Sequence, residues 1–327
     1  MPLLAFGSNA HGQLGTGATD DASVPVTCLV PNSLTTPPLC LAGGANHSVI
    51  VTADGSLLAA GANERGQLGI PGGRELHTFS PVLIPTVFPP PVFRYVACGW
   101  DHTLALTSDG DLYVFGSNEF GQLGLGADTK QVDRPLRLDI GTAVEKIAAG
   151  MRHSLISTRD QQVWGWGANN YGELGEISKP ETINGRGRFP RKRAPPVYYP
   201  ARLNVPPCSD IACGQHHSVL LTRDGRLLGL GRNRHAHFSA DGALQVSDAA
   251  LDGFSYGDAT TTTSSQRQMV KYCREGAKLS KIRPMLRVDL NMALQSIRKD
   301  VVWCGVGMNT AIAEWAARQT SENPLLS

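Results

Sequence analysis

Gly99-Trp-Asp-His-Thr103, followed by Gly116-Ser-Asn-Glu-Phe-Gly-Gln-Leu-Gly124, is the stretch that decides the fold. The second part has the pattern Gly-x-Asn-x-x-Gly-[Gln/Glu]-Leu-Gly, which starts at glycines 7, 61, 116 and 167, with a degenerate copy at 231. The first part, Gly-x-x-His-[Ser/Thr], starts at glycines 44, 99, 150 and 214, each 17 residues before glycine 61, 116, 167 or 231. A fixed spacing that recurs four times indicates a repeat of about 50 residues.

Each 17-residue unit predicts a β-hairpin. Strand-forming segments at 48–52 and 57–59 flank Asp54-Gly55, and Asp-Gly pairs recur at 109–110 and 224–225. Asp-Gly tolerates the positive φ angles of tight hairpins. Prolines at 25, 81, 135 and 200 are expected to begin a further strand at an outer edge, because proline cannot donate to a ladder. Four strands per repeat predict a propeller blade.

The predicted fold is all-β: a single β-propeller of four-stranded blades, about six in number with seven possible. Residues 3–9 match 57–63, and 301–313 resemble the strand that should precede them, so the N- and C-terminal strands are expected to pair and close the ring. The propeller should span 1–315, with a basic loop insertion at 176–207 and a degenerate blade at 240–300. Residues 316–327 are expected to form a C-terminal tail.

Composition narrows the class of protein. The chain has 327 residues, a net charge of +2 and 36 glycines, which favours many turns over helical bundles. No apolar run of about 18 residues exists, so no membrane association is expected. Seven cysteines without a Cys-x-x-Cys pair indicate a reducing compartment. A soluble, unsecreted protein is expected, in the cytoplasm and nucleus.

The two motifs and their spacing resemble the repeat of the regulator of chromosome condensation family. That family includes exchange factors for a small GTPase, ubiquitin ligase modules, photoreceptors and adaptors, so the fold alone selects no function. Within it, the segments 5–9, 46–49 and 96–101 resemble the fungal killer-toxin-insensitivity proteins, also called alpha-tubulin suppressors.

The closer resemblance implies a heterodimer with a small zinc-binding diphthamide-biosynthesis protein. Such a pair supports diphthamide synthesis on elongation factor 2 and, indirectly through Elongator, modification of transfer-RNA wobble uridines. The leading hypothesis is therefore a non-catalytic adaptor. Guanine-nucleotide exchange on a small GTPase is the alternative. An enzyme with a site at the propeller axis is the third hypothesis. It ranks last because no paired carboxylates or Ser-His-Asp set stands out in the sequence.

Trp100, Asp101 and Arg152 are candidate partner-binding residues. They lie just before the histidine slot, where the chain should turn at one face, and their equivalents differ between repeats. Variable residues on a repeated scaffold commonly carry binding specificity. The competing interpretation is that Trp100 packs against a neighbouring blade.

The insertion 176–207 supplies a second candidate surface, with a run of basic residues and no acid between 185 and 193. Clustered cations could steer an acidic partner or make a weak transfer-RNA contact. A solvated loop is the alternative. The basic residues are Arg186, Arg188, Arg191, Lys192 and Arg193.

No cofactor and no metal ion are predicted. The repeated histidines could suggest a metal ring, but their slot holds Ala259 and Asn309 in other copies, which favours a structural imidazole bonded within each blade. The cysteines at 98, 213 and 304 precede the repeat glycine, a position at which the repeat favours small residues. The glycine spacing lacks the Gly-Lys-[Ser/Thr] of a phosphate loop and predicts no nucleotide site.

Overall fold

The structure is a computed structural model that describes residues 2–31, 36–84, 89–175 and 194–232, and the backbone of three further strands at 243–244, 301–306 and 310–315. Its regular structure in these ranges consists of strands alone. They form five four-stranded sheets, as expected for propeller blades. The predicted sixth, degenerate blade at 240–300 lies outside the described residues apart from 243–244, as do the 316–327 tail and most of the 176–207 insertion.

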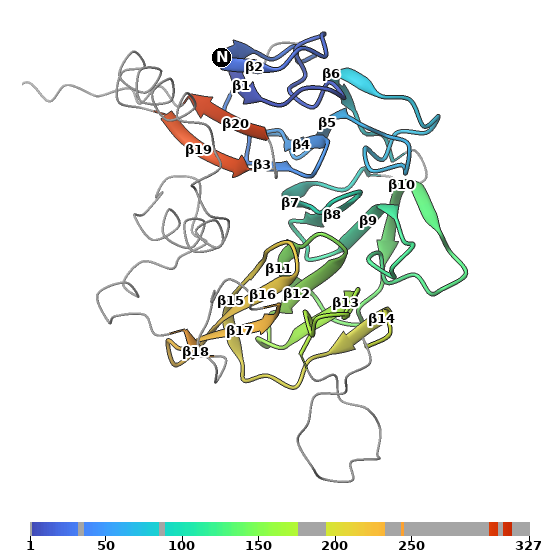
Figure 1. Ribbon diagram of the computed structural model, residues 1–327, viewed down its shortest axis with the longest axis vertical. Coiled ribbons are helices and arrows are strands. Elements are labelled where there is room, and N and C mark those ends of the chain that lie inside the picture. The colour runs from blue at the N-terminus through green and yellow to red at the C-terminus, as the bar shows by residue number, and fades with distance from the viewer. Residues whose placement is uncertain are drawn as a thin grey trace, which may run out of the picture.

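Four sheets follow the chain, and one joins its two ends (Figure 1). The terminal sheet contains β19 (Val301–Val306), β20 (Thr310–Trp315), β1 (Leu3–Gly7) and β2 (Ala22–Thr27). The first sheet contains β3 (Cys40–Gly43), β4 (His47–Val51), β5 (Leu57–Gly61) and β6 (Leu76–Pro81). The second contains β7 (Phe93–Cys98), β8 (His102–Thr107), β9 (Leu112–Ser117) and β10 (Gln131–Leu138). The third contains β11 (Val144–Ala149), β12 (His153–Thr158), β13 (Val163–Gly167) and β14 (Val197–Arg202). The fourth contains β15 (Cys208–Cys213), β16 (His217–Thr222), β17 (Leu227–Gly231) and β18 (Ala243–Leu244).

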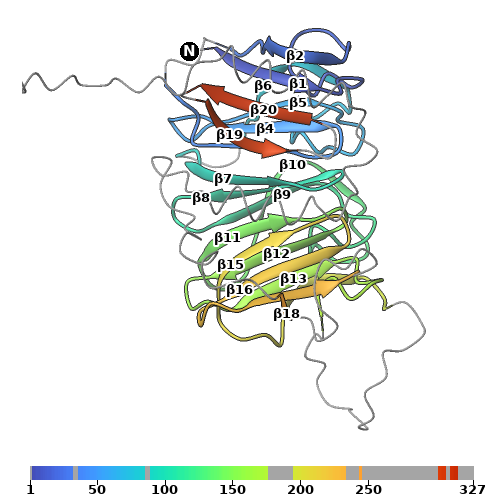
Figure 2. The same cartoon turned by 60° about the vertical axis from the view of Figure 1, so that its left-hand side comes forward.

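The sheets lie face to face in chain order, and a turned view displays them as successive layers (Figure 2). The first strand of each sheet contacts the first strand of the next: β3 meets β7, β7 meets β11, and β11 meets β15. Strand β1 pairs antiparallel with β20, in register from Leu3 opposite Glu314 to Gly7 opposite Thr310. The predicted pairing of the two chain ends is therefore present.

Apolar clusters fill the spaces between neighbouring sheets. Between the first and second sheets, Val49, Leu57 and Leu68 pack with Phe93 and Phe115, all buried. Every β4, β8, β12 and β16 residue is buried, because each of these strands is covered on both faces. The leucines of the repeated Gly-x-Asn-x-x-Gly-[Gln/Glu]-Leu-Gly motif are fully buried as well and anchor its loops: Leu14, Leu68, Leu123 and Leu174.

The loop motif is held by its own side chains. Asn118 Oδ1 accepts a hydrogen bond from Leu123 N at 2.8 Å, and Gln122 Oε1 accepts one from Phe120 N at 2.8 Å. The other copies repeat the asparagine bond at 2.9, 3.1 and 3.0 Å. Buried amides that satisfy turn backbone explain why the motif needs these residues.

One sequence prediction about the outer strands was wrong in detail. The prolines lie inside or at the end of β2, β6, β10 and β14, and do not begin them. These four strands are at a sheet edge, as expected, and Pro135 falls where the β9–β10 register shifts between Val132 and Leu136. A bulge removes the ladder bond that proline cannot donate, so the ring is tolerated there.

Gln161 occupies the tight-turn position that holds glycine in the other hairpins, and its φ is 62°. A side chain in this left-handed region costs about 1–2 kcal/mol. We expect Gln161→Gly to raise the free energy of unfolding by up to about 1 kcal/mol, since unfolded-state entropy offsets part of the gain. Urea unfolding measures this difference, with Gln162→Gly as the control because residue 162 lies outside the positive-φ position. Equal effects of the two variants would contradict the prediction.

In the described part of the chain, no helix could cross a membrane.

Candidate functional site

Buried histidines connect neighbouring sheets. Nε2 of His47 lies 3.0 Å from Thr103 Oγ1 in the next sheet, and Thr103 Oγ1 donates to Gln67 O at 2.8 Å. Since the hydroxyl proton goes to the carbonyl, the histidine Nε2 must carry its own proton and donate. His102 and Ser154 lie 3.0 Å apart, and His153 and Ser218 3.1 Å apart, in equivalent positions.

The histidines are structural, as predicted, but their bonding within each blade was a wrong expectation: the hydroxyl partner belongs to the next blade. The reason is that β4, β8 and β12 lie beside one another in neighbouring sheets, which a repeat pattern along one chain does not reveal. Burial lowers the pKa of His47, His102 and His153 to about 3 in each case, so all three rings are neutral at pH 7.

The glycine of Gly-x-x-His is required by close approach of the ring. A Cβ on Gly99 would lie 2.0 Å from His102 Cε1 and 2.5 Å from Gly150 O. The neighbouring Cys98 is half-buried, and desolvation of its thiol raises the pKa of that group above the ordinary range. The thiol is therefore protonated and poorly reactive, which favours the structural interpretation.

The turns before the histidines form one face of the molecule, which we call the loop face: residues 44–46, 99–101, 150–152 and 214–216. Backbone bonds join each turn to the next, with Ala45 N donating to Trp100 O at 3.4 Å and Trp100 N to Met151 O at 3.2 Å. Met151 N then donates to Gln215 O at 3.3 Å. Trp100 is half-buried and its backbone links three sheets, so it bridges neighbouring blades and also reaches the surface.

Loop tips from the preceding blade contact the residue before His153 and the residue before His217. Arg152 Cζ lies 4.1 Å from the centre of the Phe120 ring, a cation–π contact. The Tyr171 and His216 rings are 5.0 Å apart, and Arg232 Cζ is 5.3 Å from the Tyr171 ring. The loop-tip residue and the turn residue that it contacts thus differ in type between blades, while the backbone of the turns is the same.

Asp101 lies in the ionic part of the loop face. Burial raises the pKa of its carboxyl, while Arg65 and Arg152 lower it. Arg65 is itself paired with Glu119 at 2.8 Å, and both side chains are largely exposed. An exposed pair of this kind adds little stability, so these charges are available for recognition.

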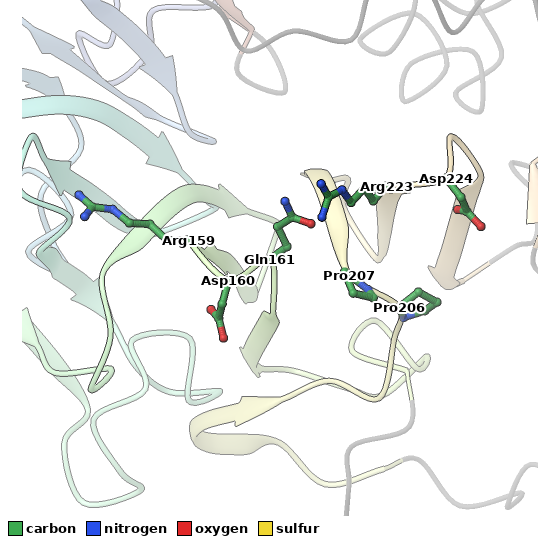
Figure 3. A pocket seen from close by; sticks show the side chains of 7 residues that line it. All are labelled: Arg159, Asp160, Gln161, Pro206, Pro207, Arg223 and Asp224. Carbon is green, nitrogen blue, oxygen red and sulfur yellow. The ribbon is translucent and has the colours of Figure 1, made fainter.

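The opposite face carries a shallow groove of about 480 Å³ between the turns of the third and fourth sheets (Figure 3). Gln161 and Arg223 lie on facing sides of it, and Pro206 and Pro207 come from the segment just before β15. Asp160 and Asp224 also line it, but their carboxylates are bonded to Thr158 and Thr222. The groove contains no constellation that suggests chemistry.

The structure brings Trp100, Asp101 and Arg152 together on one face, in adjacent turns. Arg186, Arg188, Arg191, Lys192 and Arg193 lie outside the described residues. Sequence reasoning missed the loop tips and the cation after β17, namely Phe120, Tyr171 and Arg232. The tip slot does vary between copies as His11, Arg65, Phe120 and Tyr171, and that variation was the available signal. Within the described ranges, no three metal-ligating side chains converge.

Comparison with known proteins agrees with the fold. The chain is 34% identical to the mouse secretion-regulating guanine nucleotide exchange factor, over 73% of this chain and 50% of that protein. It is 32% identical to the human probable E3 ubiquitin-protein ligase HERC6, over 71% of this chain and 22% of that protein. It is 28% identical to the Arabidopsis thaliana ultraviolet-B receptor UVR8, over 70% of this chain and 49% of that protein. The chain thus spans half or less of these relatives.

The crystal structure of human WBSCR16 has the same fold, with a TM-score of 0.57, 18% identity, and coverage of 95% of this chain and 67% of that one. The sequence also matches the RCC1-like domain over residues 2–280. The five four-stranded sheets and the histidine–hydroxyl hydrogen bonds between them agree with this match. The chain therefore belongs to the RCC1-like domain family.

Proposed function

We propose that this protein is a non-catalytic adaptor that binds a protein partner through the loop face. The observation that carries the proposal is the set of contrasting side-chain pairs on one hydrogen-bonded row of turns that includes Trp100 and Asp101. A half-buried tryptophan beside charged groups is the usual composition of a binding hot spot. Relatives named as an exchange factor, a ligase and a photoreceptor share the domain, so partner choice must lie in such variable positions.

The chemistry of the described residues favours binding over catalysis. The buried histidines donate through Nε2 and have a pKa of about 3, so they are poor proton acceptors near neutral pH. Desolvation raises the pKa of the half-buried Cys98 thiol, so this group is protonated. Groups held in this way stabilise the scaffold.

The partner we propose first is the small zinc-binding diphthamide-biosynthesis protein, in a heterodimer that acts in the cytoplasm and nucleus. The resemblance of residues 96–101 to the fungal killer-toxin-insensitivity proteins supports it, and this segment contains Trp100 and Asp101. The pair would support diphthamide synthesis and, through Elongator, wobble-uridine modification. Loss of the gene with both modifications intact would contradict this role.

A small GTPase is the second candidate partner. Two relatives are named secretion-regulating guanine nucleotide exchange factors, at 31% and 34% identity, but this chain spans only 50% of each. Exchange activity would appear as faster release of fluorescent GDP from the GTPase when the protein is added. No acceleration with a panel of small GTPases would exclude this candidate.

We expect the complex with the zinc protein to elute as one 1:1 species by size exclusion with light scattering. Trp100→Ala and Asp101→Lys should each weaken binding roughly tenfold or more, because truncation at a hot spot costs about 2 kcal/mol. Tyr199→Ala is the matched control, since that ring is 67% exposed on the outer strand β14, away from the loop face. Full affinity in both loop-face variants would place the interface elsewhere.

A further inference from the structure

We propose that the part of the loop face between the third and fourth sheets binds paired carboxylates of an acidic peptide segment. This cationic site consists of Arg152, His216 and Arg232 over the rings of Phe120 and Tyr171. The inference rests on the proposed function, because it names the chemistry of the partner segment that would dock on this face.

The three basic side chains converge on one place. Burial is the largest cause that lowers the pKa of the His216 ring, and the positive charges of Arg232 and Arg152 lower it further. The two guanidinium groups are therefore close enough to the His216 imidazole to act on its charge, and the neutral ring can donate a hydrogen bond. Arg232 Nε is buried and has no hydrogen-bond partner among the described residues. A buried, unpaired donor beside a second cation is a favourable place for an anion.

Stacking fixes the orientation of the cations. Arg152 Cζ lies over the Phe120 ring at 4.1 Å from its centre, a contact that restrains the guanidinium. Arg232 lies over Tyr171 at 5.3 Å. A guanidinium held on an aromatic face loses little entropy when it binds a carboxylate with two N–H groups.

Nearby acids leave the cations incompletely neutralised. Asp101 acts on Arg152, but burial raises the pKa of its carboxyl and Arg65 shares its charge. Glu173 is buried; its Oε2 accepts a bond from Tyr171 N at 2.8 Å, and its Oε1 lies 3.8 Å from His216 Nδ1. No other acid is paired with Arg152 or Arg232 in the described part of the chain.

A carboxylate fits this site better than a nucleic-acid base. Bases bind single-stranded sites by stacking on free aromatic faces. Here the Phe120 face is covered by Arg152, while Tyr171 is contacted by both His216 and Arg232. The rings hold the two half-buried cations, and guanidinium N–H groups suit a carboxylate.

The test is fluorescence-anisotropy titration of the full chain with a labelled oligoglutamate peptide, with oligoglutamine as the neutral probe. Arg152→Ala with Arg232→Ala should weaken oligoglutamate binding roughly tenfold or more. Arg159→Ala with Arg223→Ala removes the same charge from the opposite face, since residue 159 follows β12 and residue 152 precedes it. That control should change affinity less than about twofold.

Glu173→Gln gives a gain-of-function arm. The other three loops carry glutamine in this slot and form the same turn, so the fold should be retained. Removing the negative charge beside His216 should tighten oligoglutamate binding by roughly twofold to fivefold. Equal losses in both arginine pairs, or no effect of Glu173→Gln, would overturn the inference.

Two further outcomes separate this inference from the proposed function. If single-stranded RNA binds through Arg152 and Arg232 while oligoglutamate does not, the carboxylate assignment is wrong. If the zinc protein binds the double arginine variant with unchanged affinity but loses affinity for Trp100→Ala, the adaptor function stands and the acidic-segment site falls. If neither variant affects the partner, both are wrong.

Discussion

Gly116→Ala is expected to lower the free energy of unfolding by about 3–5 kcal/mol, the largest effect of any single substitution considered. Gly116 has a φ of 108°, and a Cβ there would lie 2.4 Å from Asp101 O and 2.7 Å from His102 Cα. Both contacts are backbone atoms, so no side chain can rotate to make room. The clash falls at the junction of the β8–β9 hairpin with the Asp101 turn.

The measurement is thermal unfolding, where this loss should lower the midpoint by roughly 4–7 °C. Gly141→Ala is the matched control, because Gly141 has a φ of 78° but nothing within 4 Å of an added Cβ. It should cost only about 1 kcal/mol, from backbone strain alone. Similar losses for the two variants would mean that the close approach at Gly116 contributes nothing.

Acid pH is expected to destabilise the protein through the buried histidines. His47, His102 and His153 have a folded pKa of about 3, well below the ordinary value of 6.5. Below pH 6.5 the unfolded chain binds protons that the folded chain cannot, so their stabilising effect is complete above 6.5 and declines toward 3. From pH 7 to pH 5 the three rings together should cost roughly 5 kcal/mol at most.

The His102→Gln variant separates the histidines from other titrating groups. Glutamine has no charge to gain, so the fall between pH 7 and pH 5 should shrink by about a third, or roughly 2 kcal/mol. Burial raises the pKa of Asp101, Glu173 and Asp210 in the folded protein. Groups of this kind increase the free energy of unfolding as pH falls, opposite to the histidines. Urea unfolding at both pH values, compared between parent and variant, cancels their contribution. Identical pH dependence in the two proteins would contradict the role of His102.

The loop face illustrates how far repeat alignment reaches. Trp100, Asp101 and Arg152 were predicted because their slot varies, and the structure places them on adjacent turns. Phe120 and Tyr171 vary in a second slot of the same alignment, yet nothing in one chain indicates that a tip from one blade lies over a turn of the next. That contact depends on how sheets stack.

The prediction for the repeated histidines was incomplete for the same reason. The sequence predicted a structural imidazole near a hydroxyl, because Gly-x-x-His-[Ser/Thr] places the two side by side. The structure pairs His47 with Thr103, a residue 56 positions away. Successive residues along a strand point to opposite faces of the sheet, so Thr103 points away from the His102 ring and meets His47 of the preceding blade.

The sequence alone determined the blade, its hairpins, the buried leucine anchors and the pairing of β1 with β20, because these depend on local turn chemistry and on a fixed repeat spacing. Tertiary structure alone decided which side chains meet between blades: His47 with Thr103, Arg152 with Phe120, Tyr171 with His216. Those contacts depend on the angle and offset between neighbouring sheets. Both are set by packing of the apolar layers between them, which no spacing along one chain specifies.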